Sequence, residues 1–114
     1  MKKSKVITIL IIIAILAFSV YILQKDKTHS DVNESFAKCL GSKSTIYVQT
    51  GCHACQQQKE MFGENYKYLT EVNCLEESFK CNIIEIRATP TWIINGERYE
   101  GIQSIEKLKE ITGC

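Results

Sequence analysis

The stretch TIYVQTGCHACQQQKEMFG at residues 45–63 decides the fold. Its beginning, Thr45–Thr50, is β-branched and aromatic and predicts a buried strand. Its end, Gln56–Phe62, contains good helix formers, and Gly63 suits the position that follows a helix. Between them, the Cys-x-x-Cys spacing of Cys52 and Cys55 places both sulfurs on one face at the helix start. We predict a dithiol–disulfide redox centre, because unpaired N–H groups and the helix dipole favour a thiolate at Cys52.

The N-terminal part of the chain predicts a membrane anchor. Residues 1–5 are basic, and Val6–Leu23 is an apolar run of 18 residues. A helix needs ~20 apolar residues to span a bilayer. The alternative is a signal peptide, whose apolar region is usually only ~7–15 residues long and is followed by a small-residue cleavage site. The segment Tyr21–Lys25 offers no such site, so we favour an uncleaved anchor.

The charge pattern orients this anchor and divides the chain. Lysines cluster before the apolar run, so the positive-inside rule places the N-terminus in the cytoplasm and everything after Leu23 outside the cell membrane. We expect a cytoplasmic N-terminus at 1–5, a transmembrane anchor or uncleaved signal at 6–23, a tether at 24–30 and one domain at 31–114. His29 falls in the tether and is expected to have no function.

Composition excludes one class of partner and indicates the compartment. The net charge is +1 and the sequence has no basic stripe, which argues against nucleic-acid binding. All six cysteines follow the apolar run. An even number of cysteines in an exported domain is typical of a disulfide-bearing protein in an oxidising compartment.

Periodicity and turn residues predict the elements of the domain. In chain order we expect a helix from Asp31 closed by Gly41, a strand at 45–50, the redox helix that starts at the CxxC and is closed by Gly63, a strand at 66–72, a helix at 76–84, a hairpin of strands at 91–94 and 98–100, and a last helix capped by Ser104 and ended by Gly113. This order is β-α-β followed by β-β-α. It predicts an α/β fold, in which a small mixed sheet is flanked by helices on both faces.

A second motif lies downstream of the two thiols. Pro90, the only proline, stands in the segment Ala88–Trp92 at the start of a predicted strand, where proline is unusual. A strand, a CxxC motif, a helix and then this Thr-Pro pair resemble the thioredoxin superfamily. The resemblance implies a thioredoxin-like fold with a cis Thr89–Pro90 bond packed against the CxxC. It also implies that the backbone of Thr89 binds substrate as an added strand.

A finer resemblance covers nearly everything after residue 34. The segments that carry it are Phe36–Leu40, the CxxC, Gln58-Lys59, Phe62-Gly63, Cys74 with Cys81, Thr89–Trp92, Tyr99–Gly101 and Thr112–Cys114. Together they resemble the thioredoxin-like domain that accompanies vitamin K epoxide reductase homologues in bacteria, archaea and plastids. This implies a DsbA-like role, in which the domain passes disulfides to exported cysteine-containing proteins. A separate, membrane-embedded, quinone-linked partner of the vitamin K epoxide reductase type would reoxidise it, and the chain itself would carry no cofactor.

The sequence departs from these relatives at two places. The related domains usually carry an aromatic residue followed by Cys-Pro-His-Cys, whereas here Gly51 precedes a His53-Ala54 interior. We expect His53 to tune the thiolate, while the redox poise stays open. Thioredoxin has a buried acid six residues before its first cysteine, and Ile46 stands there in this chain. Proton transfer must then use water or another group, for which Glu71 is a weak candidate that we expect to be solvated.

The sequence assigns roles to the two active cysteines. Cys52 is expected to be the nucleophile or the attacked sulfur, and Cys55 to resolve the mixed disulfide. Strong stabilisation of the thiolate favours an oxidase. A reductase or isomerase of exported proteins and a redox-silent, disulfide-stapled adaptor stay open as alternatives. The spacing of Cys52, Cys55, Cys74 and Cys81 is a poor match to zinc ribbons, so we expect no metal.

The other four cysteines permit three pairings. Cys74 ends a predicted strand and Cys81 follows a short connection, which favours a local bridge between them. Cys39 and Cys114 belong to the ends of the first and last helices of the domain, so a second bridge would tie these ends together. We expect both bridges to be structural, and an exchange relay with the active pair is the alternative.

Overall fold

The computed structural model describes residues 2–25 and 32–114. The predicted tether lies outside the described residues from residue 26 onward, and so do His29 and the predicted helix start at Asp31. The apolar helix α1 and the domain that begins at Val32 are therefore described separately.

Helix α1 (Lys2–Lys25) contains the whole apolar run. The segment Lys2–Leu23 has a mean hydropathy of 3.0, and none of it is buried. The hydroxyls of Thr8 and Ser19 each donate to the carbonyl one turn earlier, at 2.9 Å, so these polar groups are satisfied within the helix. The helix is long and apolar enough to cross a membrane, and a signal sequence has the same properties.

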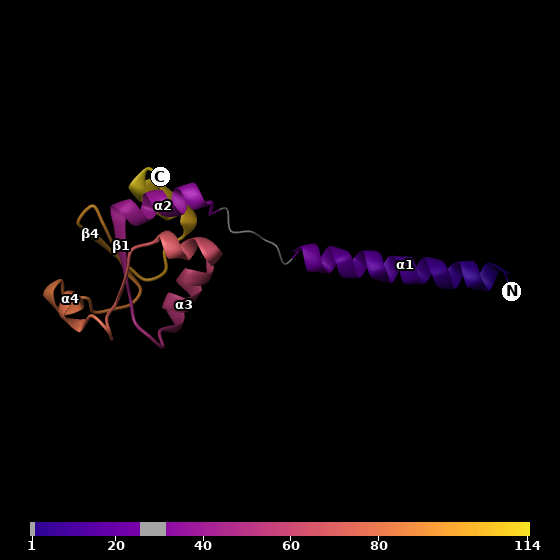
Figure 1. The fold of residues 1–114 in the computed structure, drawn as a ribbon, viewed down its shortest axis with the longest axis horizontal. Coiled ribbons are helices and arrows are strands. Elements are labelled where there is room, and N and C mark those ends of the chain that lie inside the picture. Colours follow the sequence, from indigo (N-terminus) through magenta and orange to yellow (C-terminus); the bar gives the residue numbers. More distant parts are fainter. Residues whose placement is uncertain (1, 26–31) are drawn as a thin grey trace.

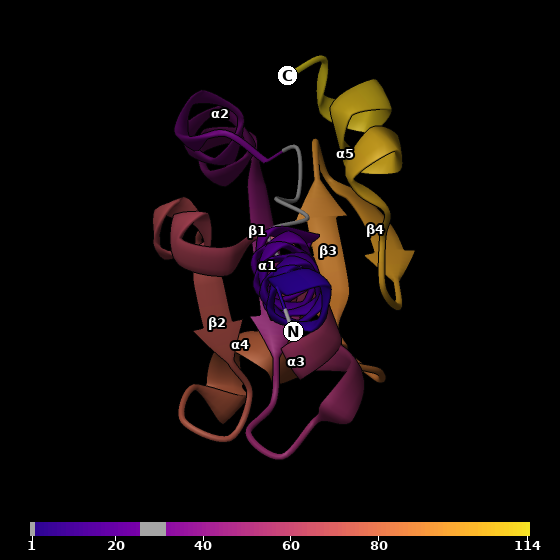
Figure 2. The same ribbon diagram turned by 90° about the vertical axis from the view of Figure 1, so that its right-hand side faces the viewer.

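A four-stranded mixed sheet forms the centre of the domain, with the strand order β2-β1-β3-β4. The strands are β1 (Ser44–Val48), β2 (Glu71–Asn73), β3 (Thr91–Ile94) and β4 (Glu97–Glu100). The β1–β2 pair is parallel and the other two pairs are antiparallel. Helices α3 (His53–Glu60) and α4 (Ser78–Ile83) lie on opposite sides of this sheet (Figures 1 and 2). The predicted mixed sheet flanked by helices is confirmed.

Helices α2 (Glu34–Lys43) and α5 (Ile105–Thr112) begin at side-chain caps. Asn33 accepts a hydrogen bond from the N–H of Phe36 at 2.7 Å, and Ser104 accepts one from the N–H of Lys107 at 3.1 Å. Helix α5 ends at Gly113, whose φ of 68° lies in the left-handed region that favours glycine. The last helix therefore has the boundaries that the sequence predicts.

Phe62 is the centre of the aromatic core. Its ring lies 6.0 Å from the ring of Trp92, 6.3 Å from that of Tyr66 and 6.5 Å from that of Phe36, measured between centroids. These partners come from β3, from the 3-10 helix η1 (Gly63–Tyr68) and from α2. One residue just after the redox helix therefore packs three elements together.

Gly41 does not end its helix, which corrects the sequence prediction. Helix α2 continues to Lys43. A Cβ atom at Gly41 would overlap the backbone carbonyl oxygen of Tyr68, at the end of η1. The glycine is therefore needed for the close approach of α2 to η1 rather than for stopping the helix.

The strand predicted at 66–72 is wrong over most of its length. Residues up to Tyr68 belong to η1, and only Glu71–Asn73 joins the sheet, as β2. The aromatic residues that suggested a strand serve another purpose, since the ring of Tyr66 packs edge-on against Phe62. This packing overrides the β-propensity of the segment.

Candidate redox site

Cys52 and Cys55 form a disulfide at the start of α3. The turn Gln49–Gly51 leads from β1 into the helix, and the N–H of Cys52 donates to the carbonyl of Gln49 at 3.1 Å. Gly51 has a φ of 83°, which favours glycine at this point of the turn. Cys52 is the N-cap residue, and its Sγ accepts a hydrogen bond from the N–H of Cys55 at 3.1 Å. The helix begins at His53, directly after Cys52, as the position of the CxxC predicts, and its first N–H groups favour negative charge on Cys52.

The two sulfur-bearing residues differ in exposure. Cys52 is half-buried, whereas only 7% of the surface of Cys55 is exposed. An incoming thiol or disulfide therefore meets Cys52 first, and Cys55 is accessible mainly from inside the domain.

The loop before β3 lies against the dithiol. The Thr89–Pro90 peptide bond is cis, and the carbonyl oxygen of Thr89 lies 3.5 Å from Cys52 Sγ. Pro90 is buried, and its carbonyl accepts a hydrogen bond from the N–H of Gly101 at 2.8 Å. The structure therefore brings Thr89 and Pro90 to the redox pair, although they follow it by more than thirty residues.

His53 is the first residue of α3 and is exposed. Its Nε2 lies 3.4 Å from the side-chain Nε2 of Gln57, one turn further along the helix. His53 therefore follows Cys52 directly and lies on the solvent-facing side of the site.

A cavity of about 220 Å³ lies on the other side of the dithiol, between α3, η1 and the β1–β2 edge. Cys52 and Cys55 line it together with Lys59, Tyr66 and Glu71. The hydroxyl of Tyr66 donates a hydrogen bond to the carboxylate of Glu71. Burial and, to a smaller extent, this hydrogen bond raise the pKa of Tyr66 above its ordinary value.

Gln58 is a structural residue of the site that the sequence reasoning missed. It is fully buried in α3, where its Oε1 accepts hydrogen bonds from Trp92 Nε1 at 3.1 Å and from the N–H of Gln103 at 2.7 Å. Its Nε2 donates to the carbonyl of Gln103 at 3.1 Å. A signal existed in the sequence, because Cys55, Gln58 and Phe62 share one helical face and a polar residue among buried ones must be hydrogen-bonded.

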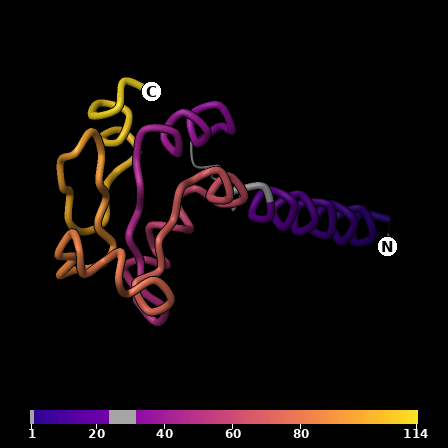
Figure 3. Tube along the Cα trace, turned by 60° about the vertical axis from the view of Figure 1, so that its left-hand side comes forward, coloured from indigo at the N-terminus to yellow at the C-terminus, as the bar shows by residue number. Residues whose placement is uncertain are grey.

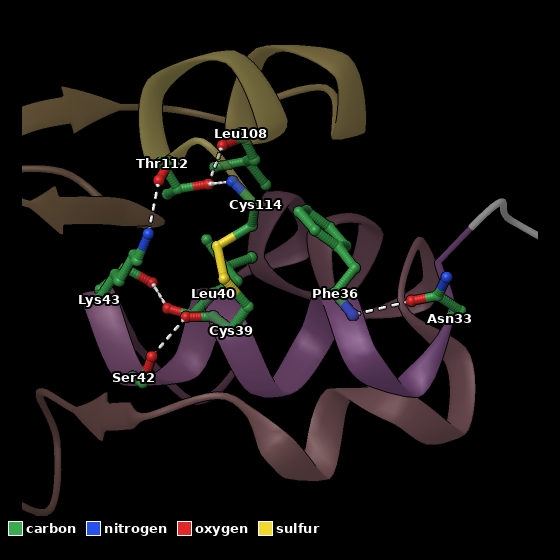
Figure 4. Close-up of a disulfide and its surroundings, with 10 residues drawn as sticks. Asn33, Phe36, Cys39, Leu40, Ser42, Lys43, Leu108, Thr112 and Cys114 are labelled. Carbon is green, nitrogen blue, oxygen red and sulfur yellow. Dashed lines mark hydrogen bonds between the residues drawn. A yellow bond between two sulfur atoms is a disulfide. The ribbon is translucent and has the colours of Figure 1, made fainter.

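The other cysteines form two more bridges. Cys74 is joined to Cys81 across the start of α4, and Cys39 of α2 is joined to Cys114. The C-terminus lies beside α2 (Figure 3). Near the second bridge, Lys43 Nζ donates to the carbonyl of Thr112 at 2.9 Å (Figure 4). Among residues 2–25 and 32–114 there is no group of three or more His, Cys, Asp or Glu side chains that could hold a metal ion.

The domain thus joins a parallel β-α-β unit to a β-hairpin, with a CxxC at a helix N-terminus and a cis-proline loop against it. The fold is thioredoxin-like. The protein Thiol-disulfide oxidoreductase LTO1 of Arabidopsis thaliana is 36% identical to this chain over 83 residues, which is 65% of this chain and 22% of that protein. The chain therefore spans about a fifth of the length of this curated relative.

Two solved structures of thioredoxin-like proteins are similar to this chain. The thioredoxin-like protein BC3987 and a point mutant of it are each 30% identical to this chain and superpose with a TM-score of 0.48. The match covers 60% of this chain, 99% of BC3987 and 97% of its mutant. No protein-family model matches the sequence.

Proposed function

We propose that this thioredoxin-like domain is a thiol–disulfide oxidoreductase that exchanges disulfides with exported proteins through Cys52 and Cys55. The observation that carries the proposal is the position of the Cys52 sulfur, on a half-buried residue at the N-terminus of α3 and 3.5 Å from the carbonyl oxygen of Thr89. The similarity to a named thiol-disulfide oxidoreductase supports it.

The geometry supports distinct roles for the two sulfurs. A substrate thiolate attacks Cys52 Sγ, the bond to Cys55 breaks, and Cys55 leaves as a thiolate. A second substrate thiolate then attacks the substrate sulfur of the mixed disulfide, and Cys52 leaves with the electron pair. The substrate gains a disulfide and the domain ends as a dithiol. The backbone of Thr89 and Pro90 would hold the substrate segment beside Cys52 during the exchange.

A trapping experiment tests this proposal. The exchange is reversible, and in its reverse direction the Cys52 thiolate attacks a substrate disulfide and Cys55 resolves the mixed disulfide. The Cys55→Ala variant lacks this resolving thiol, so we expect exported proteins to remain covalently attached to Cys52 in membranes of expressing cells. Non-reducing electrophoresis followed by mass spectrometry would identify them. The matched control is Cys52→Ala, which should trap nothing. If Cys55→Ala also traps nothing, the redox-silent adaptor is favoured instead.

The direction of exchange is a finer part of the proposal. We propose an oxidase, because the N–H of Cys55 and the start of α3 stabilise negative charge on Cys52 and so favour the reduced domain. Equilibration with glutathione buffers measures this. A potential of about −120 to −200 mV supports the oxidase, and one near −270 mV indicates a reductase. His53→Ala should shift the potential if His53 tunes the thiolate.

The membrane arrangement and the redox partner complete the proposal. We propose that α1 anchors the domain at the outer face of the cell membrane, where a vitamin K epoxide reductase-like, quinone-linked protein reoxidises it. The apolar length of α1 supports the anchor. The test uses vesicles that contain the reduced full chain, such a partner and a quinone. We expect Cys52 and Cys55 to be reoxidised only when all components are present. Reoxidation in vesicles that lack the partner would contradict its proposed role.

A further inference from the structure

Cys55 needs a proton acceptor when it closes the disulfide. To close the disulfide, its thiol must lose a proton while its sulfur attacks Cys52. Only 7% of its surface is exposed, which restricts direct contact with bulk solvent. The β1 position that precedes Cys52 by six residues holds the fully buried, apolar Ile46. This position of β1 therefore supplies no proton acceptor.

The cavity of about 220 Å³ connects Cys55 to such an acceptor. Its volume exceeds the ~30 Å³ that one water occupies in the liquid, and it is lined by polar groups, so it has room for a short chain of waters. The charged groups that face it are Lys59 from α3 and Glu71 from β2. The Ile46–Glu71 pairing of the parallel strands β1 and β2 places Glu71 directly beside the apolar position.

Tyr66 and Glu71 form one hydrogen-bonded unit at the wall of this cavity. Tyr66 has 8% of its surface exposed, and its hydroxyl donates to the carboxylate of the exposed Glu71. The Nζ of Lys59 lies 4.8 Å from the centroid of the Tyr66 ring, so a cation borders the same unit. The phenol faces inward and keeps its proton, while the carboxylate reaches bulk solvent.

Resting on the proposed exchange function, we propose that the Tyr66–Glu71 pair is the proton relay for Cys55. The Cys55 thiol gives its proton to cavity water. The Tyr66 oxygen accepts a proton from that water while its own hydroxyl proton passes to the Glu71 carboxylate. The Cys55–Cys52 sulfur bond then forms, the bond from Cys52 to the substrate sulfur breaks, and the substrate leaves as a thiolate with the electron pair. In the oxidase direction the same steps run in reverse, and the leaving Cys55 thiolate regains its proton.

Ellman's reagent separates the attack of Cys55 on a mixed disulfide from the earlier attack of Cys52 that forms it. The full chain in detergent is reduced with only enough dithiothreitol to give two thiols, desalted, and mixed with excess reagent in a stopped-flow instrument at several pH values. Attack by Cys52 releases the first thionitrobenzoate at a rate that depends on reagent concentration. Attack by Cys55 on the resulting mixed disulfide releases the second at a concentration-independent rate. The Cys55→Ala variant identifies the phases, because it should release only one equivalent.

The relay predicts changes in the second phase alone. Glu71→Gln and Tyr66→Phe preserve side-chain volume, and each should slow the second phase at pH 6 by about tenfold or more, within the range of general acid–base catalysis. In Glu71→Gln the rate should then rise about tenfold per pH unit, because attack needs a thiolate formed without the relay. The wild-type rate should depend much less on pH.

The exposed Tyr99–Glu97 pair is the matched control. The hydroxyl of Tyr99 donates to Glu97 at 2.7 Å on β4, and neither residue lines the cavity. Glu97→Gln and Tyr99→Phe should leave both phases at the wild-type rates. A normal first phase with an unchanged second phase in Glu71→Gln and Tyr66→Phe overturns the relay and leaves the exchange function standing. If the wild type shows no first phase, both the proposed exchange function and the relay are contradicted.

Discussion

The side chain of Gln58 links the redox helix to the strand that follows Pro90. It is fully buried, and its amide bonds to the indole of Trp92 and to both backbone polar groups of Gln103. Trp92 lies two residues after the proline, while Gln58 lies one turn after Cys55. This amide therefore holds together the two segments that meet at the Cys52 sulfur.

Removing this amide should destabilise the domain strongly. Gln58→Ala leaves the buried indole N–H of Trp92 without a partner, which costs about 1–3 kcal/mol, and removes two hydrogen bonds to the part-buried backbone of Gln103, so we expect a loss of about 3 kcal/mol. Urea unfolding followed by the fluorescence of Trp92, the only tryptophan, measures it. Gln57→Ala changes the neighbouring exposed glutamine and should alter the free energy of unfolding by less than about 0.5 kcal/mol. Equal midpoints for the two variants would contradict this role of Gln58.

For single residues, the sequence predicts the reactive groups better than it predicts their hydrogen-bond partners. The spacing of Cys52 and Cys55 is a local property, so it could be recognised without the fold. The partners of Gln58 are 34 and 45 residues away in the chain, and no local pattern specifies them. Glu71 is exposed, as expected, but its bond to Tyr66 appears only once η1 and β2 are placed side by side.

Among the elements, α2 and η1 pack unusually closely. Gly41 faces the backbone of Tyr68 and Leu69, and the hydroxyl of Thr70 donates to the carbonyl of Gly41 at 2.8 Å. This contact places η1, and with it Tyr66, against the wall of the redox cavity. Helix propensity alone would favour alanine at Gly41 by about 1 kcal/mol, so the contact must outweigh it.

Gly41→Ala should therefore destabilise the domain despite the better helix former. The new methyl group meets a backbone carbonyl rather than a flexible side chain, and overpacking of this kind costs about 1–3 kcal/mol. After the gain in helix propensity, a net loss of about 1 kcal/mol should lower the melting temperature by roughly 4–8 °C, as measured by circular dichroism. Ser42→Ala alters the adjacent exposed position and should change it little. A melting temperature of Gly41→Ala at or above that of the wild type would show that η1 can move away.

Element boundaries follow from the sequence where caps determine them. The last helix begins after Ser104 and ends at Gly113 because a side-chain cap and a left-handed glycine define both ends locally. The Asn95-Gly96 hairpin is equally local, with φ values of 52° and 80° at its two turn residues. The segment at 66–72 differs, because packing of Tyr66 on Phe62 decides its conformation.

For the whole molecule, the Cys39–Cys114 bridge closes the domain. Its two cysteines are separated by 75 residues, whereas those of the Cys74–Cys81 bridge are separated by 7. The longer bridge joins α2 to the segment after α5, next to the hydrogen bond from Lys43 to Thr112 (Figure 4). A domain of this size buries only a modest core, so covalent closure contributes a large share of its stability.

The two bridges should therefore differ in what their removal costs. In the chain-entropy model, Cys39→Ala with Cys114→Ala should lower the free energy of unfolding by about 4.5 kcal/mol, and Cys74→Ala with Cys81→Ala by about 2.5 kcal/mol. The free energy of unfolding of a domain is typically about 5–15 kcal/mol, so loss of the Cys39–Cys114 bridge could unfold it. Guanidinium unfolding under non-reducing conditions compares the two double variants, and each single-cysteine variant serves as a control for the loss of the side chain. If the short-bridge variant proves the less stable, contacts of α4 in the native state outweigh the entropy of the unfolded chain, and the long bridge is not what holds the domain closed.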